Sequence, residues 1–135
     1  MVSILVVDDD PSIREMLARA LNSLGEIVGA AGGQEAIDLL GSRPFDAVLL
    51  DWHMPTVDGP QVLSAMKDSR SPHAPVFVIT ADATGRAHAE AFHGGAVYFL
   101  NKPLPLITLK TLVQSALKKG ASGKSEPPRL VPNKR

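Results

Sequence analysis

In the stretch AVLLDWHMPTVDG, residues 47–59, an apolar run stops at an acidic residue. Residues 47–50 are apolar without alternation, which is typical of a strand buried on both faces of a sheet. Asp51 follows directly, and an ionised carboxylate beside such a run is costly unless something pairs with it. The position therefore predicts a functional carboxylate at the end of a buried strand.

Four more short runs alternate with stretches of helical period along the chain. The expected strands are residues 4–7, 26–30, 47–50, 76–80 and 96–100. The expected helices are residues 12–24, 34–40, 59–67, 84–92 and 104–119. This strict alternation predicts a doubly wound, flavodoxin-like α/β domain whose parallel five-stranded sheet has the order 2-1-3-4-5 and carries five helices.

The length and charge of the chain bound the class of protein. The 135 residues suffice for one core, expected in a domain over residues 1–119. Residues 120–135 are rich in Gly, Ser, Pro and basic residues and are expected to form a flexible tail or linker. The 14 basic and 14 acidic residues balance, so neither nucleic acid nor a membrane is expected as a direct partner.

The sequence holds neither cysteine nor an evident targeting segment. The lack of cysteine excludes disulfides, thiolate metal sites and a cysteine nucleophile. The first residues, MVSILVVDDD, carry no basic leader, and no apolar run reaches the roughly 20 residues of a membrane span. We therefore expect a cytoplasmic protein.

Polar residues lie at the carboxyl ends of four of the expected strands. These residues are Asp8, Asp9, Asp51, Thr80 and Lys102. The carboxyl ends of parallel strands meet at one edge of the sheet, and for this strand order the crevice lies between the first and third strands. Each residue taken alone would be an ordinary turn or surface residue, and Asp10 beside Pro11 has the position of a helix cap. Together they predict three carboxylates in one crevice, with a hydroxyl and a lysine beside them.

This combination of side chains indicates phosphoryl chemistry. Close carboxylates repel one another unless a cation joins them. A site of oxygen ligands favours Mg²⁺, which takes few protein oxygens and keeps its waters for a phosphate-bearing partner. Asp51 could then attack phosphorus, while Lys102 and the ion neutralise the phosphoryl oxygens and Thr80 donates to one of them.

Four blocks of the sequence, ILVVDDDPSIREML, VLLDWHMPTVDG, VFVITA and NKPL, resemble the signature blocks of bacterial response-regulator receiver domains. This is the family that includes the single-domain chemotaxis receiver. The resemblance covers residues 1 to about 119, with the blocks in the family's order and spacing. It implies that Asp51 is the phosphoacceptor of a two-component or phosphorelay system, supplied by a histidine kinase or a histidine phosphotransfer protein.

The resemblance also implies a set of ligands for Mg²⁺. Asp9 and Asp51 would bind the ion directly, and Asp8 would do so mainly through water. The main-chain carbonyl of His53 would supply a further ligand.

A second set of residues is implied for the phosphoryl group. The backbone N–H groups of Trp52 and Ala81 would help to hold its oxygens, and Lys102 would pair with its charge. Members of the family have a cis peptide bond before the proline that follows this lysine, here Pro103.

The resemblance further implies a switch that carries the signal out of the site. In the family, the residue at the place of Thr80 moves toward the phosphoryl group, and an aromatic residue of the fifth strand swings into the space. That aromatic residue is Phe99 here, where most members have Tyr, and Tyr98 is expected to point to the other side of the strand. His53 and Asp82 lie at positions where the family tunes dephosphorylation.

The function expected from these features is a phosphoacceptor switch that changes the face made by the fourth helix, fifth strand and fifth helix for a downstream protein target. Such a protein is regulatory and not an enzyme. Two alternatives remain, a receiver-like interaction scaffold that accepts no phosphate and a Mg²⁺-dependent aspartyl-phosphate hydrolase. The hydrolases typically have a D-x-D loop after the first strand and extra cap segments for substrate, and this short chain has neither an evident cap nor room for one. A stand-alone receiver and a piece of a longer regulator or hybrid kinase both fit the sequence.

Overall fold

A computed structural model describes residues 1–81 and 85–122 of the chain. Its strands are β1 (Ser3–Val7), β2 (Glu26–Ala30), β3 (Ala47–Asp51), β4 (Val76–Thr80) and β5 (Tyr98–Asn101). Its helices are α1 (Pro11–Leu21), α2 (Gly33–Ser42), α3 (Gly59–Ala65), α4 (Gly85–His93) and α5 (Leu106–Ser122). Short 3₁₀ turns follow α1 at Asn22–Leu24 and α3 at Met66–Asp68.

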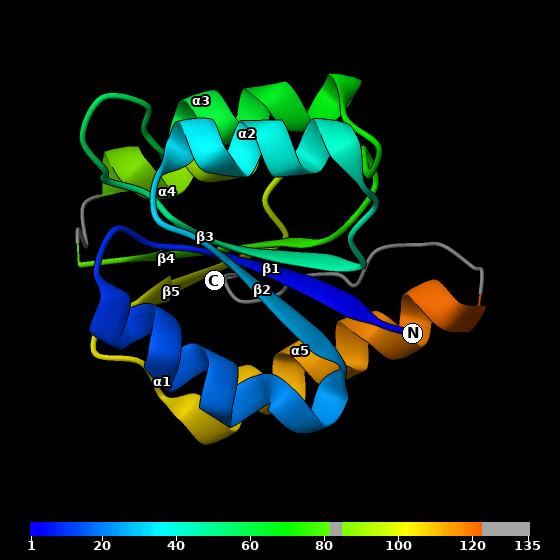
Figure 1. Ribbon diagram of the computed structural model, residues 1–135. Helices are drawn as coiled ribbons and strands as arrows, with labels where there is room; N and C mark the ends of the chain where they lie inside the picture. The colour runs from blue at the N-terminus through cyan, green and yellow to red at the C-terminus, as the bar shows by residue number, and fades with distance from the viewer. Residues whose placement is uncertain (82–84, 123–135) are drawn as a thin grey trace.

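The five strands form one parallel sheet in the order β2-β1-β3-β4-β5. Figure 1 shows α2, α3 and α4 on one face of this sheet and α1 and α5 on the other. The strand order reverses between β1 and β3, which is where the crevice was expected. The predicted doubly wound, flavodoxin-like fold is confirmed.

Two apolar cores, one on each face of the sheet, explain the uninterrupted apolar runs. Leu5 and Val48 belong to the core under α2, α3 and α4, whereas Ile4 and Leu49 belong to the core under α1 and α5. Every residue of β1, β3 and β4 is buried, because both faces of these strands are covered. The edge strands β2 and β5 are less buried.

The boundaries of all five helices differ from the prediction by a few residues. α2 covers Gly33–Ser42 where residues 34–40 were expected, α3 ends at Ala65 and not at residue 67, and α4 ends at His93 and not at residue 92. The other two differences have local reasons. The first helix was expected to reach residue 24, but α1 ends at Leu21 and the chain tightens into a 3₁₀ turn. The last helix was expected from residue 104, but α5 begins at Leu106. Leu104 precedes Pro105, and a residue before proline is disfavoured in helical backbone.

Three strands also differ from the prediction. β1 begins at Ser3, one residue earlier than expected. β5 begins at Tyr98 and not at residue 96, because the N–H of Ala96 donates to the carbonyl of Ala91 near the end of α4. β3 extends one residue further than expected, to Asp51, which pairs with Ile79 of β4. The acidic residue is therefore the last residue of the strand itself.

Some predictions fall outside the described residues. These are the roles of Asp82, the start of the fourth helix at residue 84 and the flexibility of the tail beyond residue 122. α5 runs past the expected domain boundary at residue 119. In the part of the chain that the structure describes, no helix combines the length and the apolar character needed to cross a membrane.

Candidate functional site

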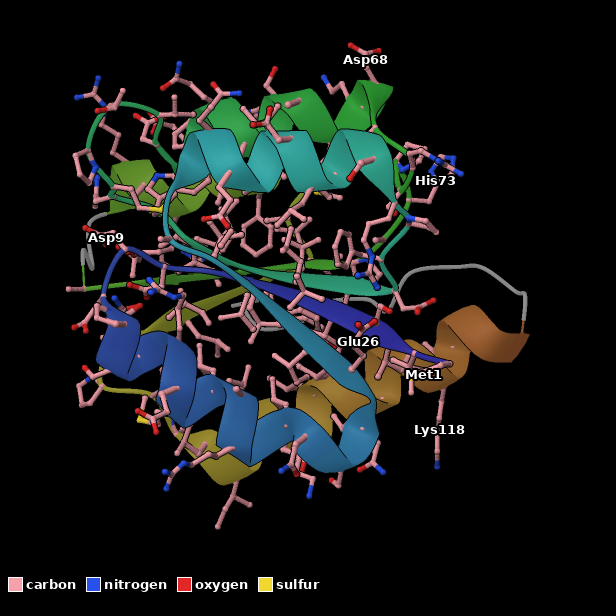
Figure 2. The ribbon with its side chains drawn as sticks, in the orientation of Figure 1. Met1, Asp9, Glu26, Asp68, His73 and Lys118 are labelled. Carbon is pink, nitrogen blue, oxygen red and sulfur yellow. The ribbon has the colours of Figure 1, made fainter. Side chains whose placement is uncertain are left out.

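Three carboxylates meet at the carboxyl end of the sheet. Asp8 and Asp9 follow β1, Asp51 ends β3, and each places a carboxylate oxygen within 4.8 Å of the other two. Asp8 and Asp51 are buried, whereas Asp9 is exposed. Figure 2 shows Asp9 at one end of the sheet and Glu26 at the other. The structure thus brings together the acidic residues that the strand order predicted.

The carboxylate of Asp8 is held on both of its oxygens. Its Oδ1 accepts a hydrogen bond of 2.9 Å from the N–H of Asp10, and its Oδ2 lies 3.1 Å from Nζ of Lys102. The Asp10 side chain accepts from the N–H and the hydroxyl of Ser12 and so caps α1, as expected for its place beside a proline. Of the three consecutive aspartates, one caps the helix and two face the crevice.

Asp51 is a buried carboxylate with 5% of its surface exposed. Burial raises its pKa to about 6, and the neighbouring charge of Asp8 adds to this effect. Lys102, with Nζ 3.7 Å from Oδ1 of Asp51, pulls the pKa in the opposite direction, as does a hydrogen bond from the N–H of His53. At neutral pH the side chain is therefore mostly ionised but poorly compensated.

Lys102 brings the positive charge of the site. Its backbone N–H donates to the carbonyl of Thr80 at 2.8 Å, which fastens the end of β5 to the end of β4. Burial alone would lower the pKa of Lys102, but the hydrogen bond to Asp8 and the charge of Asp51 raise it above its ordinary value. Thr80 itself is fully buried beside them. The peptide bond between Lys102 and Pro103 is cis, as the resemblance implied.

The loop after β3 packs its apolar residues inward. Trp52 and Met54 are buried, and Gly59 lies so close to Trp52 that a Cβ there would come within 2.7 Å of the tryptophan Cα. Asp58 caps α3 through a capping box with Gln61. These contacts fix the segment that follows the acceptor carboxylate.

Two consecutive backbone amides after Asp51 point to different places. The N–H of Trp52 donates to the carbonyl of Ile79 at 3.2 Å and so belongs to the sheet, while the N–H of His53 reaches the Asp51 side chain. The expected contact of the Trp52 N–H with a phosphoryl group stays a prediction, as does that of exposed Ala81. His53 is also exposed, and the role of its carbonyl toward a metal ion stays a prediction.

The two aromatic residues of β5 lie on opposite faces of the sheet, as expected. The ring of Tyr98 stacks on Phe77 with centroids 4.9 Å apart, in the core under α1 and α5. Phe99 is partly exposed and packs toward α4, where its ring lies 4.7 Å from the ring of His88. His88 also contacts Phe92, so Phe99 belongs to an aromatic group on the α4 side.

Sequence reasoning missed one residue that touches this region. Nη1 of Arg14, on α1, donates to the backbone carbonyl of Asp8 at 2.7 Å. The sequence does hold a signal for this contact, because Gly29 interrupts the β-branched run of β2 next to the arginine stem.

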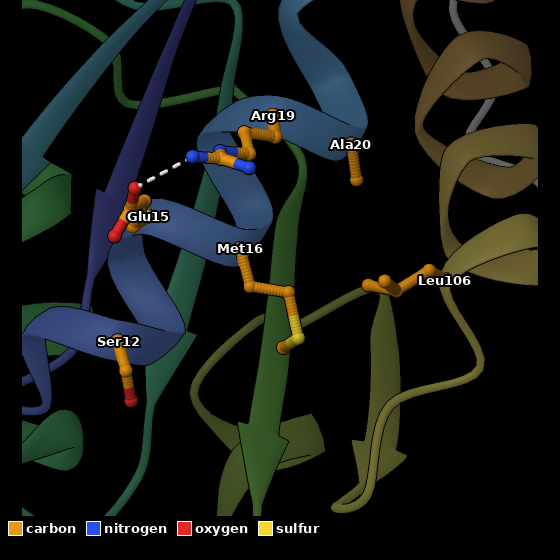
Figure 3. Close-up of a pocket in the computed structure, with 6 residues that line it drawn as sticks. All are labelled: Ser12, Glu15, Met16, Arg19, Ala20 and Leu106. Atoms are coloured by element: carbon orange, nitrogen blue, oxygen red, sulfur yellow. Dashed lines mark hydrogen bonds and ion pairs between the residues drawn. The ribbon is translucent and has the colours of Figure 1, made fainter.

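A groove of about 520 Å³ between α1 and the start of α5 contains none of the three carboxylates and lies apart from this site (Figure 3).

The three carboxylates fit a magnesium ion. Hard carboxylate oxygens are the ligands that Mg²⁺ prefers, and with bonds of about 2.0–2.1 Å its octahedron places ligand oxygens roughly 3–4 Å apart. The observed spacing of up to 4.8 Å needs only a small closure, or one ligand that binds through water. The raised pKa of Asp51 agrees with a site that lacks positive charge.

Comparisons with known proteins agree with this geometry. The model of the response regulator receiver domain matches residues 4–114. Response regulator MprA of Mycolicibacterium vanbaalenii is 38% identical over 119 residues, which are 87% of this chain but 51% of MprA, so the chain spans about half the length of that relative. Chemotaxis protein CheY4 of Vibrio cholerae is similar at a TM-score of 0.79 and 30% identity, over 86% of this chain and 98% of CheY4. The BeF3-activated DrrB receiver domain is similar at a TM-score of 0.81 and 26% identity, over 87% of this chain and 98% of that receiver domain's chain.

Proposed function

The chain belongs to the family of response regulator receiver domains, and from this premise we propose that it is a phosphoacceptor switch phosphorylated on Asp51. The observation that carries the proposal is the convergence of Asp8, Asp9 and Asp51 with the ammonium group of Lys102. Two buried carboxylates so close together lower stability, so their presence favours a chemical role over a structural one.

The proposed reaction is a transfer of a phosphoryl group to the Asp51 carboxylate. An oxygen of Asp51 forms a bond to phosphorus, the bond from phosphorus to the donor nitrogen breaks, and its electron pair leaves with the donor imidazole. With a pKa of about 6, Asp51 is ionised at neutral pH and available as the nucleophile. Lys102 lies where it can pair with the transferred charge, and the Thr80 hydroxyl is the expected donor to one phosphoryl oxygen.

Mg²⁺ is the proposed cofactor. Asp9 and Asp51 would hold it directly, Asp8 mainly through water, and the carbonyl of His53 would complete the protein ligands. When bound, the ion neutralises charge on the phosphoryl oxygens. The BeF3-activated relative DrrB supports the phosphoacceptor role of the site, because beryllofluoride mimics a phosphoryl group.

The proposed partners follow from the chemistry of the switch. A histidine kinase or histidine phosphotransfer protein would supply the phosphoryl group, and a downstream protein would read the face formed by α4, β5 and α5. Thr80 and Phe99 would link the phosphorylation site to this face, since Thr80 lies in the site and Phe99 packs against His88 of α4. We further infer a cytoplasmic regulatory protein that is not itself an enzyme and contacts neither nucleic acid nor membrane directly.

The switch can be tested with beryllofluoride and Mg²⁺ by recording backbone amide shifts. Wild type should show shifts around the site and across residues 85–110, and Phe99→Ala should keep the former and lose most of the latter. The matched control is Tyr98→Ala, which truncates the neighbouring ring on the opposite face of β5 and should keep both sets. A full wild-type pattern in Phe99→Ala would contradict the role of Phe99. No shift at all in wild type would favour a scaffold that accepts no phosphate.

A further inference from the structure

Arg14 links α1 to the loop that carries two of the three carboxylates. It lies four residues after the N-cap Asp10, and its guanidinium donates to the backbone carbonyl of Asp8 at 2.7 Å. That carbonyl belongs to the peptide group that joins Asp8 to Asp9. A hydrogen bond to it therefore fixes the plane from which both carboxylates extend.

The other hydrogen bonds of Asp8 do not involve its carbonyl, so Arg14 is the residue that fixes the orientation of the Asp8–Asp9 peptide group. The N–H of Asp8 donates to the carbonyl of Ala30 in β2, and its side chain is held by Asp10 and Lys102. These bonds fix the preceding peptide and the carboxylate. The carbonyl that faces Asp9 is fixed from α1.

The sheet leaves room for the arginine stem. A Cβ at Gly29 of β2 would lie 3.5 Å from Cδ and 3.8 Å from Nε of Arg14, so the stem passes over the backbone of the edge strand where a side chain is missing. A branched side chain at this position would occupy the path of the stem. The glycine, unfavourable inside a strand, thus coincides with the place where another side chain approaches closely.

We propose that Arg14 is a positioning residue for the metal and phosphoryl site, acting through the Asp8–Asp9 peptide. The inference rests on the proposed function, because it assigns Arg14 a part in the same site. Partners that orient metal ligands typically contribute about 10–100-fold to metal affinity. A single hydrogen bond to a backbone carbonyl belongs at the lower end of this range.

The same helix offers a matched control. Arg19 is an exposed arginine of α1 that pairs with Glu15 at 3.0 Å, and its side chain is 78% exposed (Figure 3). Arg14→Met keeps an apolar stem over Gly29 but removes the donor. Arg19→Met makes the same chemical change without touching the site.

Mg²⁺ affinity is measured through the fluorescence of Trp52, the one tryptophan of the chain, which directly follows Asp51. Arg14→Met should weaken Mg²⁺ binding about tenfold, while Arg19→Met retains the wild-type affinity. Arg14→Lys, which keeps a cationic donor, should recover part of the loss. Without metal, the amide of Asp10, hydrogen-bonded to Asp8, should exchange with solvent faster in Arg14→Met only.

The outcomes separate this inference from the proposed function. Wild type that binds no Mg²⁺ would overturn both. Wild type that binds Mg²⁺ while Arg14→Met binds it equally well would overturn the role of Arg14 alone. Equal losses in Arg14→Met and Arg19→Met, or no recovery in Arg14→Lys, would also overturn it, because a general effect of charge or helix stability would then account for the data.

Discussion

The two ends of the sheet both carry clusters of charged residues, but the clusters are built in opposite ways. At the amino end, Glu26 and Arg43 pair near the surface, and about two fifths of each side chain is exposed. At the carboxyl end, Asp8 and Asp51 are buried and share the single ammonium group of Lys102. At the amino end an acidic side chain is paired with a basic one, whereas at the carboxyl end two buried carboxylates face one basic side chain.

At the amino end, the carboxylates accept hydrogen bonds from neighbouring side chains and backbone. The Arg43 guanidinium donates to the Glu26 carboxylate and to the Ser3 hydroxyl, and that hydroxyl also donates to Glu26 at 2.8 Å. The bond from Arg43 holds the pKa of Glu26 below its ordinary value. Asp46 accepts from the N–H of Ser3. The charged state of Glu26 is therefore favoured by folding.

The carboxyl end shows the reverse, because burial and like charge raise the pKa of Asp51 to about 6. The charged state of Asp51 is opposed by folding. The contrast indicates that the amino end contributes to stability, whereas the carboxyl end gives up stability for a site that a cation and a phosphoryl group can complete. Changes of pH should therefore alter the contributions of Asp51 and Glu26 to the free energy of unfolding in opposite directions, and so should Asp51→Asn and Arg43→Met.

The largest expected effect is a gain of stability when Asp51 is neutralised. Asp51→Asn should raise the free energy of unfolding at neutral pH by about 3 kcal/mol without Mg²⁺, since each pKa unit corresponds to about 1.4 kcal/mol. Urea denaturation of both proteins in the presence of chelator measures the difference. A mutant that is less stable than wild type would show that the buried charge is well compensated.

The same pair of proteins gives the pH dependence of the carboxyl end. An unfolded chain loses the Asp51 proton near pH 3.8, while the folded protein keeps it until about pH 6. Between these values the folded state binds more protons, so its stability falls as the pH rises. The advantage of Asp51→Asn should be near zero below about pH 3.5 and nearly complete above about pH 7. An advantage that is constant over this range would contradict the assigned pKa.

Lys102→Met is expected to lower the stability of the protein, by less than Asp51→Asn raises it. Removing the cation leaves Asp8 and Asp51 facing each other, and should lower the free energy of unfolding by about 2 kcal/mol at neutral pH. The loss is below that of a fully buried pair because Lys102 keeps 23% of its side chain exposed. Added Mg²⁺ should stabilise this mutant more than wild type, because the ion replaces the lost charge. Equal stabilisation of the two by Mg²⁺ would place the ion elsewhere.

The smallest effect is expected at the amino end. Arg43→Met should lower stability slightly at neutral pH and leave phosphorylation and Mg²⁺ binding unchanged, because this network lies at the opposite end of the sheet. Since the folded pKa of Glu26 is lowered, its contribution is present above the ordinary value of 4.5 and is lost as the pH falls through the folded value. The difference between mutant and wild type should therefore shrink in acid, the reverse of the trend for Asp51→Asn. Altered Mg²⁺ binding in Arg43→Met would mean that the two ends are coupled.

The sequence was sufficient to predict the sheet and the meeting of the carboxylates. Buried parallel strands leave continuous apolar runs, and 26–30 and 76–80 match β2 and β4 at both ends. Once the strand order is known, residues that follow strands must lie at one edge, so Asp8, Asp51 and Lys102 could be placed together. The sheet and the convergence of these side chains can therefore be predicted from the pattern of burial and the strand order alone.

Other features depend on details that a pattern does not contain. Which amide faces the crevice depends on where the ladder between β3 and β4 ends, and the N–H of Trp52 is still part of it. The contact of Arg14 with the Asp8 carbonyl depends on the rotation of α1 about its axis and on the space above Gly29. These are properties of packing between elements. Gly29 inside the β2 run marks a place where another side chain can approach, but no residue spacing tells which side chain does so.

Mass spectrometry can show whether Asp51 accepts a phosphoryl group in a Mg²⁺-dependent reaction. Wild type is treated with acetyl phosphate in the presence of Mg²⁺ and, separately, of chelator, with Asp51→Asn as the control for the acceptor. Wild type with Mg²⁺ should gain the mass of one phosphoryl group, located on Asp51, and neither the chelated sample nor the mutant should gain it. Equal phosphorylation without Mg²⁺, or a phosphoryl group on another residue of wild type, would contradict the proposed role of Asp51.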